Sequence, residues 1–382
     1  MRSVDIIGVG MVGFGKHPEE SSIEMGARAV IDALKDASVK PAEVGVGFYA
    51  NSMGPQLFGE LTAGQTMFWK AGVNGVSVFN TENACASGAS NFHLAWMAVG
   101  SGMYDIAVAV GAEKMLVPGV GLMNGGEFQL EILEGFVAPV DFAMRAVRHM
   151  ALYGTTREQL AMVSVKNRRH GSMNAMASFR EPVTLEAVLN APMISDPLTR
   201  MMCCPNADGA AAVVLCASEL SQRYTSRPVR ILTSVAAGGR LDNPADIVPW
   251  EVDYRACRTA YEMAGIGPDD VDLVECHDAF TINEILHYEA LGLCPEGEGG
   301  HLVESGATGL GGRIPVNVSG GLISRGHAIA ATGAAQLVEG VLQLRGQAGA
   351  RQVEGAKVYL GELIGGEYLG VTKICTVNVL SI

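Results

Sequence analysis

Aromatic and charged residues are scarce in this chain of 382 residues: Phe, Trp and Tyr supply 6% of it, and Asp, Glu, Lys and Arg supply 18%. Hydrophobic residues make up 48%, and 48 glycines are spread along the chain without a low-complexity tract. This composition excludes a collagen-like or disordered chain. A chain of this length can bury a large core over two or three domain-sized units. We therefore expect packed α/β layers in which helices approach strands closely.

Positive charge is also in short supply, because 27 Lys and Arg face 40 Asp and Glu, for a net charge of −13. A nucleic-acid backbone needs a basic footprint, so nucleic acid is excluded as a main partner. No apolar run reaches the roughly 20 residues that span a bilayer, since the stretch after Leu94 ends at Asp105. The N-terminus, with Arg2 and Asp5, lacks the apolar core of a secretory signal. We therefore expect a cytoplasmic protein without a membrane span.

Cysteine patterns typical of metal sites and disulfide frameworks are missing. The eight cysteines contain no C-x-x-C pair, and Cys203 and Cys204 are adjacent. Thiols of an acidic chain without a secretory signal stay reduced, and most free cysteines lie in the core. We therefore expect no metal site and no tightly bound cofactor.

The first strand and helix signals lie close to the N-terminus. The apolar run 4–9 predicts a buried strand. A helix follows from Ser22, because Ser21 and Glu24 have the spacing of a capping box and an apolar stripe comes after them. Residues 44–49 predict the next strand.

The second half of the chain repeats this pattern. Residues 260–268 echo residues 33–41, and in each copy an acidic turn and a strand follow the proline. Each copy then delivers polar residues, at 51–52 in the first and at 277–278 in the second, where His277 and Asp278 stand. Strand-helix-strand units that recur in this way predict two similar α/β halves.

A stretch with a different character separates the two copies. Residues from about 116–197 are rich in Met, Arg and Asn and contain the basic run 166–170. They predict an insertion of helix and loop on the first half. A polar connection at 218–227 follows, so we expect an N-terminal half over 1–225 and a C-terminal half over 226–382.

Gly8, Gly10 and Gly13 fit the dinucleotide-binding pattern G-x-G-x-x-G after a strand. That pattern works only where the last glycine opens a helix whose N-terminus meets the pyrophosphate. Gly15 and Pro18 disfavour an immediate helix. A glycine-rich strand exit therefore explains the pattern, and a nicotinamide enzyme stays a formal alternative.

Cys85 lies among small residues between a predicted strand at 76–80 and a predicted helix that runs through Leu94 and Met97. A cysteine at a helix N-terminus has a lowered pKa, because the helix dipole favours the thiolate. Such a thiolate is a nucleophile without any metal. The local sequence alone also fits a buried structural cysteine.

Motifs along essentially the whole chain resemble those of thiolases. The segment 83–115, which starts Asn-Ala-Cys-Ala-Ser-Gly, is similar to the thiolase nucleophile segment. Four further motifs resemble the sterol-carrier-protein-like and archaeal branch: 194–198, 203–205, 208–211 and 275–281. The pair 316–321 and 326–327 resembles the segment that carries the thiolase histidine. The resemblance implies the thiolase fold, in which two similar βα halves form a five-layered αβαβα sandwich with an inserted loop domain.

The resemblance also implies site residues. Cys85 is expected to accept the acyl group of a CoA thioester, and His327 to activate Cys85 and help bind an oxyanion. His277 is expected to orient water or the thioester oxygen. Backbone N–H groups of Gly365 and Cys85 are expected to complete the oxyanion hole. The implied activity is that of an acetyl-CoA C-acyltransferase, in condensation or thiolysis.

The C-terminus departs from the thiolase pattern. Leu363 stands where thiolases usually carry a second catalytic cysteine, and Leu cannot carry a proton. Ala279 stands where some members of the branch carry that cysteine, Cys375 lies too far along the chain, and strand alternation points Cys276 away from His277. Four outcomes stay open: a histidine moves the α-proton in ordinary condensation, the acyl group goes to a different carbon acceptor, the reaction is retro-aldol cleavage, or the chain is a non-catalytic lipid- or CoA-binding subunit.

Ligand and partner expectations also rest on the resemblance. The CoA phosphates need a local basic site in an acidic protein, and Lys166, Arg168 and Arg169 are candidates, although they equally fit a solvated helix face. Thiolases form homodimers or homotetramers through the first-half sheet. Members of this branch work with a small zinc-ribbon and OB-fold protein, so such a partner is a further expectation.

Overall fold

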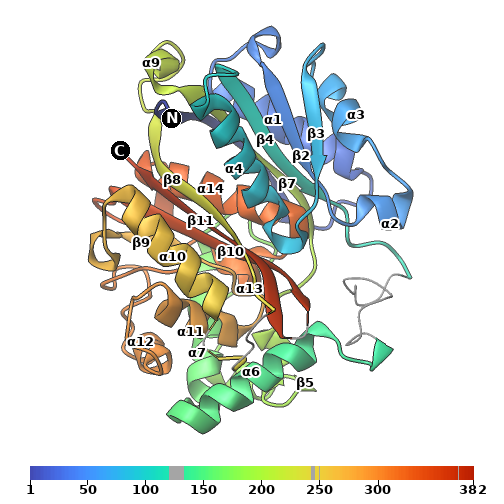
Figure 1. Ribbon diagram of the computed structural model, residues 1–382. Coiled ribbons are helices and arrows are strands. Elements are labelled where there is room, and N and C mark those ends of the chain that lie inside the picture. The colour runs from blue at the N-terminus through green and yellow to red at the C-terminus, as the bar shows by residue number, and fades with distance from the viewer. Residues whose placement is uncertain (120–132, 242–245, 249, 369) are drawn as a thin grey trace.

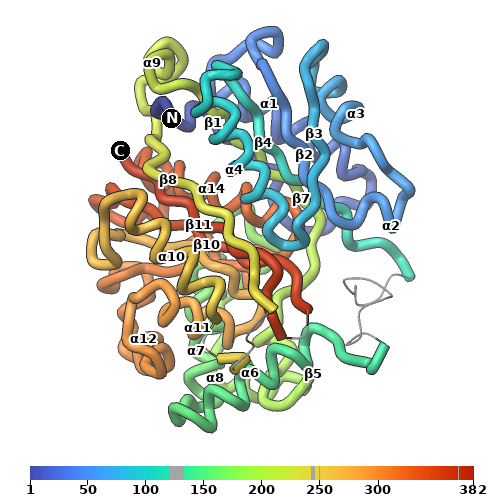
Figure 2. Tube along the Cα trace, viewed as in Figure 1, coloured from blue at the N-terminus to red at the C-terminus, as the bar shows by residue number. Residues whose placement is uncertain are grey.

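The computed structural model describes residues 1–119, 133–241, 246–248, 250–368 and 370–382 (Figures 1 and 2). The first part of the chain contains these elements: β1 Val4–Gly15, α1 Ser22–Asp36, β2 Val46–Ala50, α2 Gly54–Phe58, α3 Ala63–Lys70, β3 Ser77–Thr81, α4 Ser87–Gly100, β4 Ile106–Glu113, α6 Ala138–Tyr153, α7 Arg157–Ser172, α8 Leu185–Leu189, β5 Met193–Ser195, β6 Leu198–Thr199, β7 Asp208–Ala217 and α9 Ser218–Ser221. The second part contains these: β8 Val229–Gly238, α10 Glu251–Ala264, β9 Leu273–Glu275, α11 Thr281–Ala290, α12 Gly299–Glu304, α13 Gly321–Arg325, α14 Thr332–Leu344, β10 Val358–Tyr368 and β11 Val371–Ser381.

Nine strands of the described residues form one continuous sheet, in the order β3-β2-β4-β7-β1-β8-β11-β10-β9. β1 and β8 join at the centre through only two residue pairs, Asp5 with Arg230 and Ile6 with Val229. Going outward from this junction, each half has two antiparallel pairings and then parallel pairing, with two parallel pairs in the first half and one in the second. The two similar halves expected from the sequence repeat are therefore confirmed, and their sheets touch edge to edge at the junction.

Helices cover both half-sheets and also fill the space between them (Figure 1). α1 and α3 pack on the outer face of the first half-sheet, and α10 packs on the outer face of the second. α4 and α14 lie against each other between the two half-sheets, with a core of Val, Ile, Leu and Ala side chains around them. This order of layers is the αβαβα sandwich expected from the resemblance.

β1 runs on to Gly15, well beyond the strand predicted at 4–9. Its glycines allow α1 to lie close, because a Cβ on Gly8 would come within 2.3 Å of Ala33 O and a Cβ on Gly10 within 2.2 Å of Ala29 O. The strand continues through Gly13, so no helix starts there. The G-x-G-x-x-G pattern thus serves helix–strand packing, and the geometry that a nicotinamide site needs is absent from this described segment.

Local signals for α1 are confirmed in detail. Ser21 Oγ accepts a hydrogen bond from Glu24 N, and the Glu24 carboxylate accepts one from Ser21 N, which completes the capping box. Among the residues that the structure describes, no helix is both long and apolar enough to cross a membrane.

The insertion expected over about 116–197 contains α6, α7 and α8 and the short strands β5 and β6, while its residues 120–132 lie outside the described part of the chain. α7 packs against α11 and α13 of the second half. The chain passes from α9 to β8 through 222–228. We propose that 1–225 and 226–382 are the two halves, with this insertion on the first.

Candidate active site

Cys85 lies in a short 3₁₀ turn, Ala84–Ala86, that precedes α4. Ala84 has φ +48°, a left-handed conformation that is strained for a residue with a side chain. Two hydroxyl groups hold it, because the Oγ atoms of Ser87 and Ser52 both donate hydrogen bonds to Ala84 O, at 2.6 and 3.3 Å. Cys85 therefore lies on a strained turn that two hydroxyl groups hold, directly before α4.

The Cys85 thiol is half-buried, and burial raises its pKa to about 12, with the negative charge of Glu113 adding to the rise. This result corrects the expectation that the helix dipole lowers the pKa of Cys85. Desolvation is the largest cause of the rise, because the turn places the thiol among buried neighbours. The thiolate therefore forms only when a neighbouring base takes the proton.

His327 is the basic side chain placed beside the thiol, since its Nε2 lies 3.2 Å from Cys85 Sγ. Its Nδ1 lies 2.9 Å from Thr332 Oγ1, and the Thr332 hydroxyl donates its single hydrogen to Ala328 O. Nδ1 must then carry the proton that Thr332 accepts, which leaves the lone pair of Nε2 facing the thiol. Burial, together with the charge of Arg325, lowers the pKa of His327 to about 3, so the ring is neutral at neutral pH.

Backbone contacts from both sides fix the His327 segment. His327 N donates to Pro205 O at 2.9 Å, and Ala207 N donates to His327 O at 3.2 Å. Gly326 before it has φ +101° and lies so close to Ser178 that a Cβ would approach Ser178 Oγ to 2.6 Å. The glycine in the motif is therefore needed where the chain turns from α13 towards α14.

His277 follows β9 and faces His327, with ring centroids 5.5 Å apart. The side chain is buried, and among the described residues neither of its ring nitrogens has a hydrogen-bond partner. Burial, and then the charges of His327 and His287, lower its pKa well below the usual value. One ring nitrogen of each histidine and Cys85 Sγ lie within 4.8 Å of one another. The neutral His277 ring is thus free to bond a ligand at the thiol.

A buried polar cluster that the sequence reasoning missed holds the backbone of His277. Glu362 Oε2 accepts the His277 N–H at 3.1 Å, and His287 Nε2 lies 3.1 Å from His277 O. His287 Nδ1 lies 2.5 Å from Asp253 Oδ2. Burial opposes a charge on His287, but the carboxylates of Glu362 and Asp253 prevail and raise its pKa to about 9. No local motif marks these residues, because β10, α10 and α11 bring them together only in the fold.

Gly365 lies directly against the Cys85 turn, since a Cβ there would come within 2.3 Å of Asn83 O and 2.8 Å of Ala86 N. Leu363, two positions earlier on the same face of β10, is buried beside Gly333 at the start of α14. Cys375 pairs with the residue between them, Ile364, and its Sγ contacts Asp253 on the opposite face. The thiol of Cys375 therefore cannot replace the cysteine missing at Leu363.

The structure takes Lys166 out of the candidate phosphate site. Its side chain is buried, and its Nζ pairs with Glu284 Oε1 at 2.7 Å and donates to Val316 O at 2.7 Å. The basic run looked solvated in the sequence, but α7 packs into the second half, so Lys166 is committed to the fold. Arg168 lies over the Phe179 ring, 4.1 Å from its centroid, and Arg169 is exposed.

Two comparisons cover nearly the whole chain. Residues 4–219 match the family model "Thiolase, N-terminal domain", and residues 240–374 match "Thiolase C-terminal domain-like". The chain belongs to the thiolase family. This thiolase is 42% identical to the acetyl-CoA acetyltransferase of Methanothermobacter thermautotrophicus, over 96% of this chain and 97% of that one. It is 38% identical to the benzoylsuccinyl-CoA thiolase subunit BbsB of Thauera aromatica, over 92% of each.

Two further relatives extend the comparison. Human sterol carrier protein 2 is 35% identical to this thiolase, over 96% of this chain and 70% of that one. The solved structure of an Ltp2-ChsH2(DUF35) aldolase superposes with a TM-score of 0.83 at 24% identity, over 99% of this chain and 97% of that one. The archaeal and sterol-carrier relatives confirm the branch that the sequence motifs resembled, and the solved structure agrees in fold.

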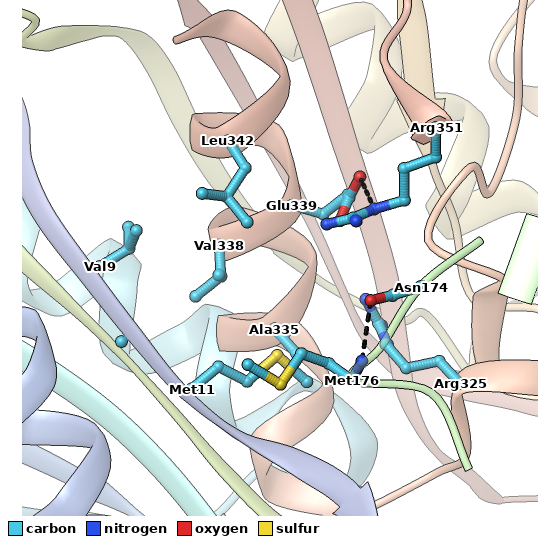
Figure 3. Close-up of a pocket in the computed structure, with 11 residues that line it drawn as sticks. Val9, Met11, Asn174, Met176, Arg325, Ala335, Val338, Glu339, Leu342 and Arg351 are labelled. Atoms are coloured by element: carbon cyan, nitrogen blue, oxygen red, sulfur yellow. Dashed lines mark hydrogen bonds and ion pairs between the residues drawn. The ribbon is translucent and has the colours of Figure 1, made fainter. Parts of the chain in front are cut away.

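A separate cavity of about 180 Å³ opens between β1 and α14 (Figure 3). On one wall Val9, Met11 and Val338 are apolar, and on the other Glu339 pairs with Arg351 at 2.9 Å. None of Cys85, His277 and His327 lines this cavity, and its walls carry no nucleophile. The candidate active site is therefore the group of Cys85, His277 and His327, called the Cys85 cluster.

Proposed function

We propose that this thiolase transfers acyl groups from CoA thioesters through an acyl-Cys85 intermediate, as an acetyl-CoA C-acyltransferase. The observation that carries the proposal is the 3.2 Å contact between Cys85 Sγ and Nε2 of a neutral His327 whose other nitrogen is oriented by Thr332. A nucleophile next to a base that a third group orients is the arrangement of covalent acyl transfer. The names of the relatives at 42% and 38% identity, an acetyltransferase and a thiolase, support the same chemistry.

The proposed acyl-transfer step uses each group of the Cys85 cluster. His327 takes the thiol proton, and the Cys85 thiolate adds to the thioester carbonyl. The negative charge on that oxygen is held by backbone N–H groups of Cys85 and Gly365 and by the unpartnered ring of His277, because donors aimed at a developing oxyanion stabilise the transition state. The C–S bond to CoA then breaks, CoA leaves, and the acyl group stays on Cys85.

Peptide mass spectrometry after incubation with acetyl-CoA tests this proposal. An acetyl group is expected on the peptide that contains Cys85 and on no other cysteine peptide. Cys85→Ala should abolish both the adduct and turnover. Cys294→Ala, which changes a half-buried cysteine outside the Cys85 cluster, should keep both. A wild-type protein with neither the adduct nor any turnover would instead favour a non-catalytic lipid- or CoA-binding subunit.

Retro-aldol cleavage of a CoA thioester is the second candidate, and Leu363 favours it because the usual proton-carrying thiol is missing there. Such a cleavage needs no acyl-cysteine. A β-hydroxyacyl-CoA that releases an aldehyde equally fast with wild type and with Cys85→Ala would select this candidate. Transfer of the acyl group to a carbon acceptor other than CoA thioesters would keep the Cys85 adduct and change only the product.

We further propose that Arg168 and Arg169 contribute to binding the CoA phosphates. Arg169→Ala should lose affinity for CoA and keep its affinity for S-acetyl-N-acetylcysteamine, a short thioester without phosphates. The matched change Arg180→Ala, which removes an exposed arginine further along the same chain segment, serves as the control.

We propose that this thiolase is cytoplasmic and that two copies of it meet at the edge strand β3. β3 forms the end of the sheet (Figure 1). Two large apolar side chains are exposed there, Phe79 of β3 at 50% and Trp69 of α3 at 61%. An unpaired edge with exposed aromatics is a template for pairing with another strand. Light scattering should give a dimer or tetramer, and Phe79→Lys should shift it towards monomer.

A small zinc-ribbon and OB-fold partner stays part of the proposal, and the name of the structural neighbour includes a second component, ChsH2(DUF35).

A further inference from the structure

Arg325 is a buried arginine whose guanidinium has donors left unused. It ends α13, two residues before His327, and is 1% exposed. Its Nη1 donates to Ser319 Oγ at 3.1 Å and reaches Glu275 Oε2 at 3.4 Å. Among the residues that the structure describes, neither Nε nor Nη2 of Arg325 has a hydrogen-bond partner. Buried donors of a charged group that find no acceptor cost free energy, so a ligand that supplies the acceptor is favoured.

The two unpartnered nitrogens of Arg325 share one edge of the guanidinium. The Nε–H of an arginine and one N–H of its Nη2 point the same way, and this planar fork matches the two oxygens of a carboxylate. Nη1 uses another side of the group for Ser319 and Glu275. The ring of Phe14 covers one face, 5.6 Å from Arg325 Cζ to its centroid, and a phenyl ring carries no oxygen or nitrogen acceptor. The free edge of Arg325 therefore fits a bidentate carboxylate.

The cavity of about 180 Å³ between β1 and α14 adjoins this group, because Arg325 is one of the residues that line it. Figure 3 shows Arg325 across the cavity from Val9, Met11 and Val338, whose side chains are apolar. A ligand that bonds Arg325 can therefore lay a hydrocarbon tail against this wall. An apolar cavity of roughly 150 Å³ holds a molecule the size of benzene, so the tail that fits here is short.

The second arginine of the cavity is already paired. Arg351 donates from Nε to Glu339 Oε1 at 2.9 Å and from Nη2 to Glu339 Oε2 at 2.9 Å, and its Nη1 donates to Ala348 O at 3.0 Å. The counter-charge of Arg325 is weaker, because burial raises the pKa of Glu275 although the charge of Arg325 opposes the rise. An acidic ligand therefore meets unmatched positive charge at Arg325 and not at Arg351.

We propose that this cavity binds a short-chain monocarboxylate of about four to six carbons, with its carboxylate on Nε and Nη2 of Arg325 and its tail between β1 and α14. The free acid is the ligand, because its CoA thioester has no carboxylate to offer the guanidinium. The site is separate from the Cys85 cluster, since none of Cys85, His277 and His327 lines the cavity.

Calorimetric titration of the wild-type protein with butyrate, without any CoA thioester, tests the proposal. One butyrate per chain is expected to bind. The affinity should rise about fourfold for each methylene from acetate to butyrate, because the apolar wall buries the tail. 1-Butanol has a similar tail without the charge and should bind at least about tenfold more weakly, since it loses the charge-assisted pair of hydrogen bonds. Equal affinities for butyrate and 1-butanol, or no saturable binding of butyrate, would overturn the proposal.

Three variants locate the bound acid. Arg325→Lys keeps a positive charge beside Glu275 but removes the fork, so butyrate affinity should fall at least about tenfold. Arg351→Lys is the matched control, because it changes the paired arginine of the same cavity, and it should keep the wild-type affinity. Val338→Phe fills the apolar side of the cavity without touching Arg325. It should abolish butyrate binding, and it decides the matter if Arg325→Lys fails to fold.

Competition with acetyl-CoA separates this site from the Cys85 cluster. Butyrate in the cavity should stay bound when acetyl-CoA is added, and Cys85→Ala should bind it with the wild-type affinity. The titration therefore gives the same answer whether or not Cys85 accepts acyl groups. Butyrate binding that survives in Val338→Phe and is displaced by acetyl-CoA would overturn the proposal, because it would place the acid at the Cys85 cluster.

Discussion

Gly365 is the position where close packing of β10 most tightly constrains the turn that carries Cys85. A Cβ at Gly365 would lie 2.3 Å from Asn83 O and 2.8 Å from Ala86 N. Carbon and oxygen need about 3.3 Å or more, so Gly365→Ala must move the Cys85 turn and β10 apart by about 1 Å. Overpacking of this kind costs roughly 1–3 kcal/mol of stability. A 1 Å misplacement of a reacting group costs about 10²-fold in rate.

The assay is the rate constant for acetylation of Cys85 in a rapid-quench experiment, with the thermal midpoint measured alongside. Gly365→Ala should acetylate about 10²-fold more slowly and unfold a few degrees lower. Gly238→Ala is the matched control, because a Cβ on this glycine of β8 meets nothing closer than 3.9 Å. Acetylation at the wild-type rate in Gly365→Ala, with the same thermal midpoint, would refute the packing of β10 against the nucleophile turn.

Three further predictions follow from the same contacts. Thr332→Val keeps the shape of the side chain but removes the acceptor of the His327 Nδ1 proton, so acetylation should slow by about tenfold, as for the loss of one hydrogen bond. Thr332→Ser should recover most of the rate. Equal rates in wild type, Thr332→Val and Thr332→Ser would contradict the tautomer assignment. Because the folded pKa of His327 is about 3, the acetylation rate should stay level as pH falls from 8 to about 5, and a decline centred near pH 6.5 would show an unperturbed imidazole. The unfolded chain binds a proton at His327 below about pH 6.5 and the folded chain does not, so the thermal midpoint should fall there as the pH is lowered. Lys166→Met leaves Glu284 as a buried unpaired charge and should cost about 3–5 kcal/mol, several degrees in thermal midpoint, without changing CoA affinity, and a specific loss of CoA affinity would return Lys166 to the binding site.

Elements with a strong local signal could be predicted from the sequence. The capping box of Ser21 and Glu24 begins α1 as expected, and the internal repeat predicts the two similar α/β halves. The length of β1 could not be predicted, because glycines in a row indicate a loop when read locally. Only the close approach of α1 to Gly8 and Gly10 explains why the strand needs them.

The site was predictable only in part, for a physical reason. Cys85, His277 and His327 could be named from motif resemblance, and the structure brings them together. Groups that orient them could not be named, since Thr332 looks like an ordinary helix residue and Glu362 meets His277 only through the register of β10. A residue's partners across the fold are invisible to local pattern.

Electrostatics marks the same limit. A cysteine before a helix predicts a lowered pKa, but burial raises the pKa of Cys85 instead. A basic helix face predicts a solvated lysine, but Glu284 on α11 holds Lys166 inside. Both predictions failed because desolvation depends on the layers that cover a residue, and those layers come from distant parts of the chain.

The acyl-Cys85 intermediate is tested most directly by a burst of free CoA on mixing the enzyme with excess acetyl-CoA. An acyl-enzyme predicts a rapid release of one CoA per functional site before steady turnover, with a matching gain of one acetyl group in the intact mass, and neither in Cys85→Ala. Steady turnover from the first moment with no mass gain, at a rate that Cys85→Ala retains, would contradict the assignment of Cys85 as the nucleophile.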